Sequence, residues 1–122
     1  MTIIEAINKI DSLKPNNCSQ DMKVGWLSRL DGIIKEKVID THEGADAVVF
    51  TGYDGSDTST ELLVPAPYDE LYVKWLEAQI DYANGEYGKY NNSMTMYNSI
   101  YNEFENYYNR HNMPKGTKLK YL

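Results

Sequence analysis

Two stripes of apolar residues at helical spacing, separated by a short break, most constrain the fold of this 122-residue chain. The first stripe lies within 71–87 and the second within 94–108. Gly85 and Gly88 mark the break, and Pro114 ends the second stripe. Each stripe is typical of an amphipathic helix. Because the connection is so short, the two helices are predicted to form an antiparallel hairpin.

The first third of the chain predicts two further helices. Apolar residues recur every three or four positions over 2–14, where Thr2 and Glu5 have the spacing of a capping box. Ser19 is the predicted N-cap of a second helix, whose apolar stripe begins at Met22. The chain therefore contains four predicted helices.

The pattern between the second and third helices changes to that of β-structure. Two short apolar runs, 47–50 and 61–64, flank a turn-forming stretch at 52–57. A β-hairpin over about 46–65 is therefore predicted, with strand edges that are free to pair with another chain. Pro67 is predicted to occupy the first position of the third helix.

These elements define the expected architecture. The fold class is mainly α, a four-helix arrangement with an antiparallel C-terminal helical hairpin and a small β-hairpin inserted between helices 2 and 3. The length suits one domain with one core. We expect that domain to span residues 1–113 and a flexible basic tail to span 114–122.

The net charge of −6 is unevenly distributed. The segment 110–122 has four basic residues and no acidic one, so the rest has 8 basic and 18 acidic residues, a balance of −10. An acidic body argues against a protein that wraps nucleic acid, because phosphates are bound by Lys and Arg. The basic tail has two interpretations: contact with an acidic partner, or a solubilising terminus.

Cysteine content and hydropathy indicate the compartment. A single cysteine, Cys18, excludes an internal disulfide and is typical of a reducing environment. The sequence has no signal-peptide pattern and no apolar run near the roughly 20 residues of a membrane span. We expect a soluble cytoplasmic protein without membrane contact.

No catalytic, cofactor-binding or metal-binding pattern is found. His42 and Glu43 resemble the start of a zinc-protease motif, but Asp46 stands where the second histidine belongs. A group of acidic residues in the predicted turn lacks the ligand spacing of a calcium loop: Asp54, Asp57 and Glu61. The sequence therefore predicts a protein that is not an enzyme and needs no cofactor.

Tyrosine and asparagine are concentrated in the C-terminal half. Of the 11 tyrosines, all but Tyr53 lie from Tyr68 onward. They suit either a core between two helices or a contact surface. Four asparagines share one face of the last predicted helix: Asn98, Asn102, Asn106 and Asn109. This face is either solvated or used for hydrogen bonds to a partner.

The C-terminal half also resembles a known family. The runs Leu63–Tyr72, Trp75–Tyr82, Tyr90–Met94 and Tyr107–Gly116 are similar to small proteins from the structural-gene clusters of tailed bacteriophages and prophages of Gram-positive hosts. They resemble head-tail connector, or adaptor, proteins. The resemblance implies a helical subunit of a ring beneath the portal, through which DNA passes. It also implies that no cofactor is needed.

The resemblance names partners, and physical reasoning names contact residues. The implied partners are the portal protein, the next connector protein and further copies of the chain. The implied location is the host cytoplasm before assembly and the virion afterwards. The predicted strand edges would pair with a neighbouring copy through Val48, Phe50, Leu62 and Val64. The basic tail would dock on an acidic portal surface through Lys115, Lys118, Lys120 and Tyr121. The alternative is a small intracellular regulator or inhibitor that binds one protein partner through its Tyr- and Asn-rich helices.

Overall fold

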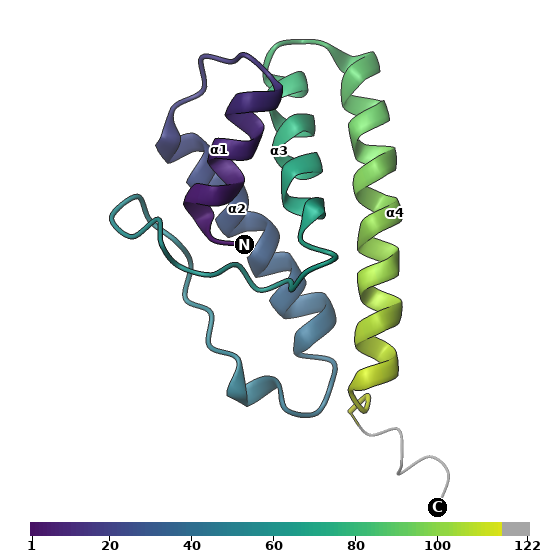
Figure 1. Ribbon diagram of the computed structural model, residues 1–122. Helices are drawn as coiled ribbons and strands as arrows, with labels where there is room; N and C mark the ends of the chain where they lie inside the picture. Colours follow the sequence, from purple (N-terminus) through teal and green to yellow (C-terminus); the bar gives the residue numbers. More distant parts are fainter. Residues whose placement is uncertain (116–122) are drawn as a thin grey trace, which may run out of the picture.

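The computed structural model describes residues 1–115, and these fold into a helical domain (Figure 1). The α-helices are α1 (Ile3–Leu13), α2 (Gln20–Ile34), α3 (Glu70–Ala83) and α4 (Tyr87–His111). A π-helical turn, η1 (Lys35–Ile39), continues α2, and a 3-10 turn, η2 (Ala45–Ala47), follows it. The predicted helical class is confirmed. Among the helices in residues 1–115, none is long and apolar enough to cross a bilayer.

The first two helices begin at the predicted caps. The Glu5 amide donates to Thr2 Oγ1 at 3.2 Å, and the Thr2 amide donates to Glu5 Oε1 at 3.1 Å. Both halves of the capping box are therefore formed. The Met22 amide donates to the hydroxyl of Ser19 at 3.2 Å, which caps α2. The Met22 side chain itself is exposed, so the predicted stripe of α2 was wrong at its first residue.

Helices α3 and α4 form the predicted antiparallel hairpin (Figure 1). Only residues 84–86 separate them, and Gly85 has a left-handed φ of 74°. The indole of Trp75 on α3 packs on the ring of Tyr97 on α4, with centroids 5.2 Å apart. Pro67 does not begin α3, because Pro65 and Tyr68 first close a turn and the helix starts at Glu70.

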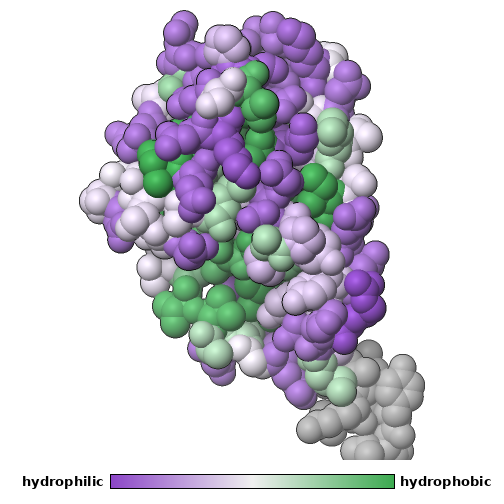
Figure 2. Space-filling model, viewed as in Figure 1, coloured by the Kyte–Doolittle hydropathy of each residue, from purple (hydrophilic) through white to green (hydrophobic). Residues whose placement is uncertain are grey.

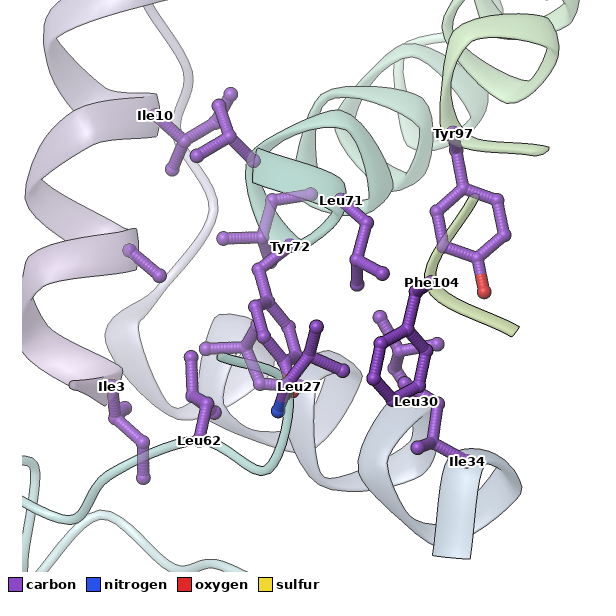
Figure 3. Close-up of a cluster of buried hydrophobic side chains, with 14 of the residues drawn as sticks. Ile3, Ile10, Leu27, Leu30, Ile34, Leu62, Leu71, Tyr72, Tyr97 and Phe104 are labelled. Atoms are coloured by element: carbon purple, nitrogen blue, oxygen red, sulfur yellow. Dashed lines mark hydrogen bonds between the residues drawn. The ribbon is translucent and has the colours of Figure 1, made fainter. Parts of the chain in front are cut away.

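The core lies around α3, which contacts all three other helices (Figure 3). Ile3 and Ile10 of α1 face it from one side, and Phe104 of α4 lies on the other. Leu27 and Leu30 of α2 fill the space beneath Tyr72 and Leu71. Most of the described tyrosines from Tyr68 onward are half-buried along this core, while Tyr82 and Tyr87 are exposed.

The predicted β-hairpin over 46–65 is wrong. Within residues 1–115 the structure has isolated bridges but no strand, and the segment crosses the bundle as an extended loop. The reason lies in its hydrogen bonds, which join the start of α1 in place of the other half of the segment. The Ile3 amide donates to Thr60 O at 3.0 Å, and the Leu62 amide donates to Met1 O at 3.0 Å. We call residues 40–69 the α2–α3 loop.

Candidate protein-binding surfaces

A buried carboxylate, Asp31 on α2, holds the α2–α3 loop against the helices. It is fully buried and accepts hydrogen bonds from the hydroxyl of Tyr53, from Tyr72 Oη at 2.6 Å and from the Leu63 amide at 3.0 Å. The Tyr72 hydroxyl in turn accepts the Val64 amide at 2.8 Å. One side chain therefore fixes two points of the loop, at residues 53 and 63–64.

The surroundings of Asp31 determine its protonation. Burial raises the pKa of the Asp31 carboxyl above its ordinary value, and its hydrogen bonds from Tyr53, Tyr72 and Leu63 offset part of that rise. Burial and the neighbouring carboxylate also raise the pKa of the Tyr72 phenol. All three donors point at Asp31, so the arrangement has the form of a structural anchor.

Two of the predicted contact residues belong to the core. Leu62 is 6% exposed and Val64 is 1% exposed, and the amides of both are bonded within the domain. The strand edge predicted at these residues is absent, because Met1 and Tyr72 take its hydrogen-bonding groups. Neither side chain lies at a surface where a partner would touch it.

The other predicted strand lies at the surface. Val48 is half-buried against the core, Val49 is 80% exposed, and Phe50 is again half-buried. The Phe50 ring lies beside Gly32 of α2 and packs edge-on against Tyr53, with centroids 5.1 Å apart. Figure 2 shows hydrophobic side chains gathered at the lower left of this face, where Figure 1 draws the segment after η2.

Beside this segment the α2–α3 loop encloses an open groove of about 310 Å³, which we call the loop groove. Its apolar lining includes Val49, Phe50 and Leu63. Its acidic lining consists of Asp54, Asp57 and Glu61, all exposed. The amino group of Met1 lies 3.2 Å from Glu61 Oε2, so this carboxylate has one cationic neighbour.

Asp54 and Asp57 shape the turn that they occupy. Asp54 Oδ1 accepts from the Ser56 amide at 2.8 Å, and Asp57 Oδ1 accepts from the Ser59 amide at 3.1 Å. These hydrogen bonds, with those from the two serine hydroxyls, lower the pKa of both carboxyls. Both aspartates are therefore ionised at neutral pH and present negative charge to the groove.

The end of the described chain is joined to the start of the α2–α3 loop. The Glu43 amide donates to Met113 O at 2.7 Å, and the Lys115 amide donates to Thr41 O at 3.0 Å. The Lys115 side chain is exposed, as its predicted binding role requires. The other predicted tail residues, Lys118, Lys120 and Tyr121, lie outside the described residues.

His42 is a buried structural residue at this junction. Its Nδ1 lies 2.6 Å from Val38 O, and its Nε2 lies 2.7 Å from Asn109 Oδ1. Its ring packs edge-on against Tyr108. The other three asparagines of the predicted row, Asn98, Asn102 and Asn106, are exposed. Across residues 1–115 no group of three or more His, Cys, Asp or Glu residues is placed to hold a metal ion.

A second surface lies where α2 meets the helical hairpin. A groove of about 300 Å³ is lined by Arg29, Trp75, Gln79, Tyr82 and Tyr90. The exposed ring of Tyr82 meets the rings of Tyr87 and Tyr90 edge-on, at 5.5 Å and 5.3 Å between centroids. Tyr, Trp and Arg are the residue types that dominate protein interfaces.

The buried acids were missed by sequence reasoning. Asp31 follows Leu30 and lies one turn after Leu27, on the face of α2 that carries Ile34. A charged residue on an apolar face is the signal that would have found it. Asp81 on α3 is likewise fully buried and joins Lys14 to Ser93, whose Oγ lies 3.2 Å away.

Comparison with known proteins gives no relative: no family model, curated protein or solved structure matches the chain.

Proposed function

We propose that this chain is a structural, non-enzymatic adaptor of the head-tail junction of a tailed bacteriophage or prophage. Copies of the chain form a ring beneath the portal protein, and the ring meets the next connector protein on its other side. DNA passes through without sequence-specific binding. The protein acts in the host cytoplasm before assembly and in the virion afterwards.

The observation that carries the proposal is the resemblance of the C-terminal half to such adaptors. The resembling runs, Leu63–Tyr72, Trp75–Tyr82, Tyr90–Met94 and Tyr107–Gly116, coincide with one structural unit: the α3–α4 hairpin and the segments at its two ends. A ring subunit needs a stiff scaffold that presents different surfaces to its two neighbours. The hairpin supplies such a scaffold, and the loop groove belongs to the separate α2–α3 loop.

The charge distribution supports the passage of DNA. The chain outside 110–122 has a balance of −10. A duplex is repelled by such a surface at short range, so it can slide past without being held.

Binding to the portal protein tests the proposal directly. The full chain is mixed with the assembled portal encoded in the same gene cluster, and the mixture is examined by size-exclusion chromatography with light scattering and by electron microscopy. We expect the chain to co-elute with the portal and to add a ring of density at one end of it. A portal from an unrelated gene cluster serves as the control. Failure to join its own portal would overturn the adaptor function.

A second candidate function, a small intracellular regulator or inhibitor, is favoured by the aromatic groove around Trp75 and Tyr82. Its lining of Arg29, Trp75, Tyr82 and Tyr90 has the composition of a binding hot spot. Double substitution of Tyr82 and Tyr87 by alanine separates the two functions. The adaptor proposal predicts unchanged portal binding, because it assigns the portal contact to the basic tail, whereas the regulator function predicts loss of binding to its one partner.

A further inference from the structure

The surface segment 49–52 is an unpaired edge whose exposure pattern is that of a strand as far as Thr51, and at Gly52, with a φ of 98°, the chain turns. Exposure alternates from Val48 to Thr51, as it does along an extended chain. No hydrogen bond from the described part of the chain reaches the backbone N–H or C=O groups of 49–52. At Tyr53 pairing resumes, because its amide donates to Ser28 Oγ at 3.0 Å. An exposed edge of this kind is a template for a further extended segment.

The surroundings of this edge are strongly acidic. Between Val38 and Lys74 the chain has eight acidic residues and no Lys or Arg. Three of the eight, Asp54, Asp57 and Glu61, line the loop groove beside the edge. Asp21 of α2 adds a fourth carboxylate nearby, because its Oδ1 lies 2.5 Å from the position that a Gly55 Cβ would occupy. An occupant of the groove therefore needs positive charge.

The same chain contains a segment of matching chemistry. Residues 116–122 read Gly-Thr-Lys-Leu-Lys-Tyr-Leu, with alternating basic and apolar residues and no acidic one. In an extended segment Lys118 and Lys120 lie on one face, and Leu119 and Tyr121 lie on the other. Pairing along 49–52 would place Leu119 and Tyr121 on the face of the edge that carries the half-buried Phe50, and it would leave the lysines on the other face to meet the acidic side chains.

We propose that the loop groove binds the basic C-terminal segment, residues 116–122, of a second copy of the chain, which adds to the exposed edge at 49–52 as a short strand. The inference rests on the proposed ring, which needs a surface of one copy to meet a different surface of the next. The start of the α2–α3 loop pairs with residues 113–115, whereas Figure 1 places the middle of the loop at the left of the molecule and the end of α4 at the lower right. The contact is therefore heterologous and repeats from copy to copy.

This contact uses complementary charge inside one sequence. The acidic middle and the basic end attract each other between copies, and the attraction weakens as salt screens it. The tail was also predicted to dock on the portal, which is therefore a competing binding site for residues 116–122. The test is done without the portal.

Intermolecular paramagnetic broadening tests the proposal without any portal. One chain has a Cys18→Ser substitution, one cysteine added after Leu122 and a spin label on that cysteine. It is mixed with an isotope-labelled Cys18→Ser chain, and only the amide signals of the second chain are observed. We expect signals of 49–63 to broaden, and a free peptide of residues 113–122 to reverse the effect. No broadening, or broadening elsewhere, would overturn the inference.

Charge variants provide a matched comparison. Asp54→Asn and Asp57→Asn keep the amide oxygen that accepts the Ser56 and Ser59 bonds, so the turn survives while two charges are lost. We expect this pair to weaken binding of the 113–122 peptide by about fivefold or more in low-salt buffer. Glu36→Gln with Glu103→Gln removes two exposed charges outside the groove and should change binding less than about twofold. Equal weakening by both pairs would indicate attraction to overall charge alone and would overturn the site.

A second measurement separates the contact between copies from a contact within one chain. If the label broadens 49–63 only in the chain that carries it, and the full chain sediments as a monomer at every concentration, the segment folds back on its own groove and the proposal fails. Neither result depends on the portal. If the chain binds the portal but does not make this contact, only the inference about the groove fails. If the chain makes the contact but does not bind the portal, the proposed adaptor function fails.

Discussion

At the scale of the residue, Asp31 decides how the longest loop lies on the bundle. Its two oxygens accept three hydrogen bonds, two of them from residues of the loop itself. Buried polar groups are costly without partners and stabilising with them. This acid on α2 and the backbone of the start of α1 together hold the loop for which the sequence predicts a strand ladder.

Asp31→Asn should destabilise the protein by about 1–3 kcal/mol. An amide has one acceptor oxygen, so whichever way it faces, its NH₂ group meets either the Tyr72 hydroxyl or the Leu63 amide, both of which are donors here. Urea unfolding followed by circular dichroism measures the loss. Asp46→Asn, at an exposed site, is the control and should change stability by less than about 0.5 kcal/mol. Equal stability of the two variants would contradict the anchor.

The raised pKa of Asp31 also gives stability a defined pH dependence. A carboxyl whose pKa is higher in the folded state binds more protons there, so its contribution is complete below the unfolded pKa of about 3.9 and is lost as pH rises through the folded pKa. The stability of the wild type relative to Asp31→Asn should therefore fall as pH rises across this window. Unfolding of both proteins over a pH series measures it, and a relative stability that rises with pH would contradict the assignment.

At the scale of the element, the turn between α3 and α4 depends on one glycine. Gly85 has a φ of 74°, a conformation that side chains disfavour, while Gly88 lies inside α4 with ordinary helical geometry. Gly85→Ala should destabilise the protein by about 1–2 kcal/mol. Gly88→Ala should leave stability unchanged or raise it by up to about 1 kcal/mol.

No atom lies within 4 Å of the Cβ position at either glycine, so the pair isolates backbone conformation from crowding. Thermal unfolding of the two variants gives the comparison. If both substitutions shift the midpoint in the same direction by the same amount, φ at Gly85 does not control the turn.

The helices were predictable because their signals are local. Thr2 and Glu5 are three residues apart, and the stripe through Trp75 and Ile80 repeats within each turn. The β-hairpin failed for the opposite reason. Its hydrogen bonds go to groups elsewhere in the chain. Tyr72 is 8 residues from Val64, Asp31 is 32 residues from Leu63, and Met1 is separated from Leu62 by all of α1 and α2. No local pattern reveals such partners.

At the scale of the whole molecule, residues 113–115 after α4 are hydrogen-bonded to the start of the α2–α3 loop. A chain that ends at Asn112 loses both backbone bonds between 113–115 and 41–43, whereas a chain that ends at Lys115 keeps them. Hydrogen exchange at the Glu43 amide should therefore be faster in the shorter chain and unchanged in the longer one. Similar exchange in both would show that Met113 does not protect this amide.

The predicted contact residues differ in where the structure places them. Val48 and Phe50 are half-buried at the surface segment that contains the unpaired edge, and Lys115 is exposed. Leu62 and Val64 have the same apolar character, yet they are buried, because only the tertiary structure decides which of two similar runs faces the core. Exposure was easier to predict for the charged residues of the loop than for its apolar ones, because acidic side chains on a loop are rarely buried.

The pairing of Lys115 with Thr41 fixes the point on the domain after which residues 116–122 follow in the sequence. Seven residues follow Lys115 in the sequence, and a peptide of that length spans at most about 24 Å when fully stretched. Whatever those residues bind on a neighbour must lie within that radius of the anchoring point. In the proposed ring, residues 116–122 would reach the loop groove of the next copy only if it lies within that distance of Lys115, and a longer segment would reach further at a lower effective concentration.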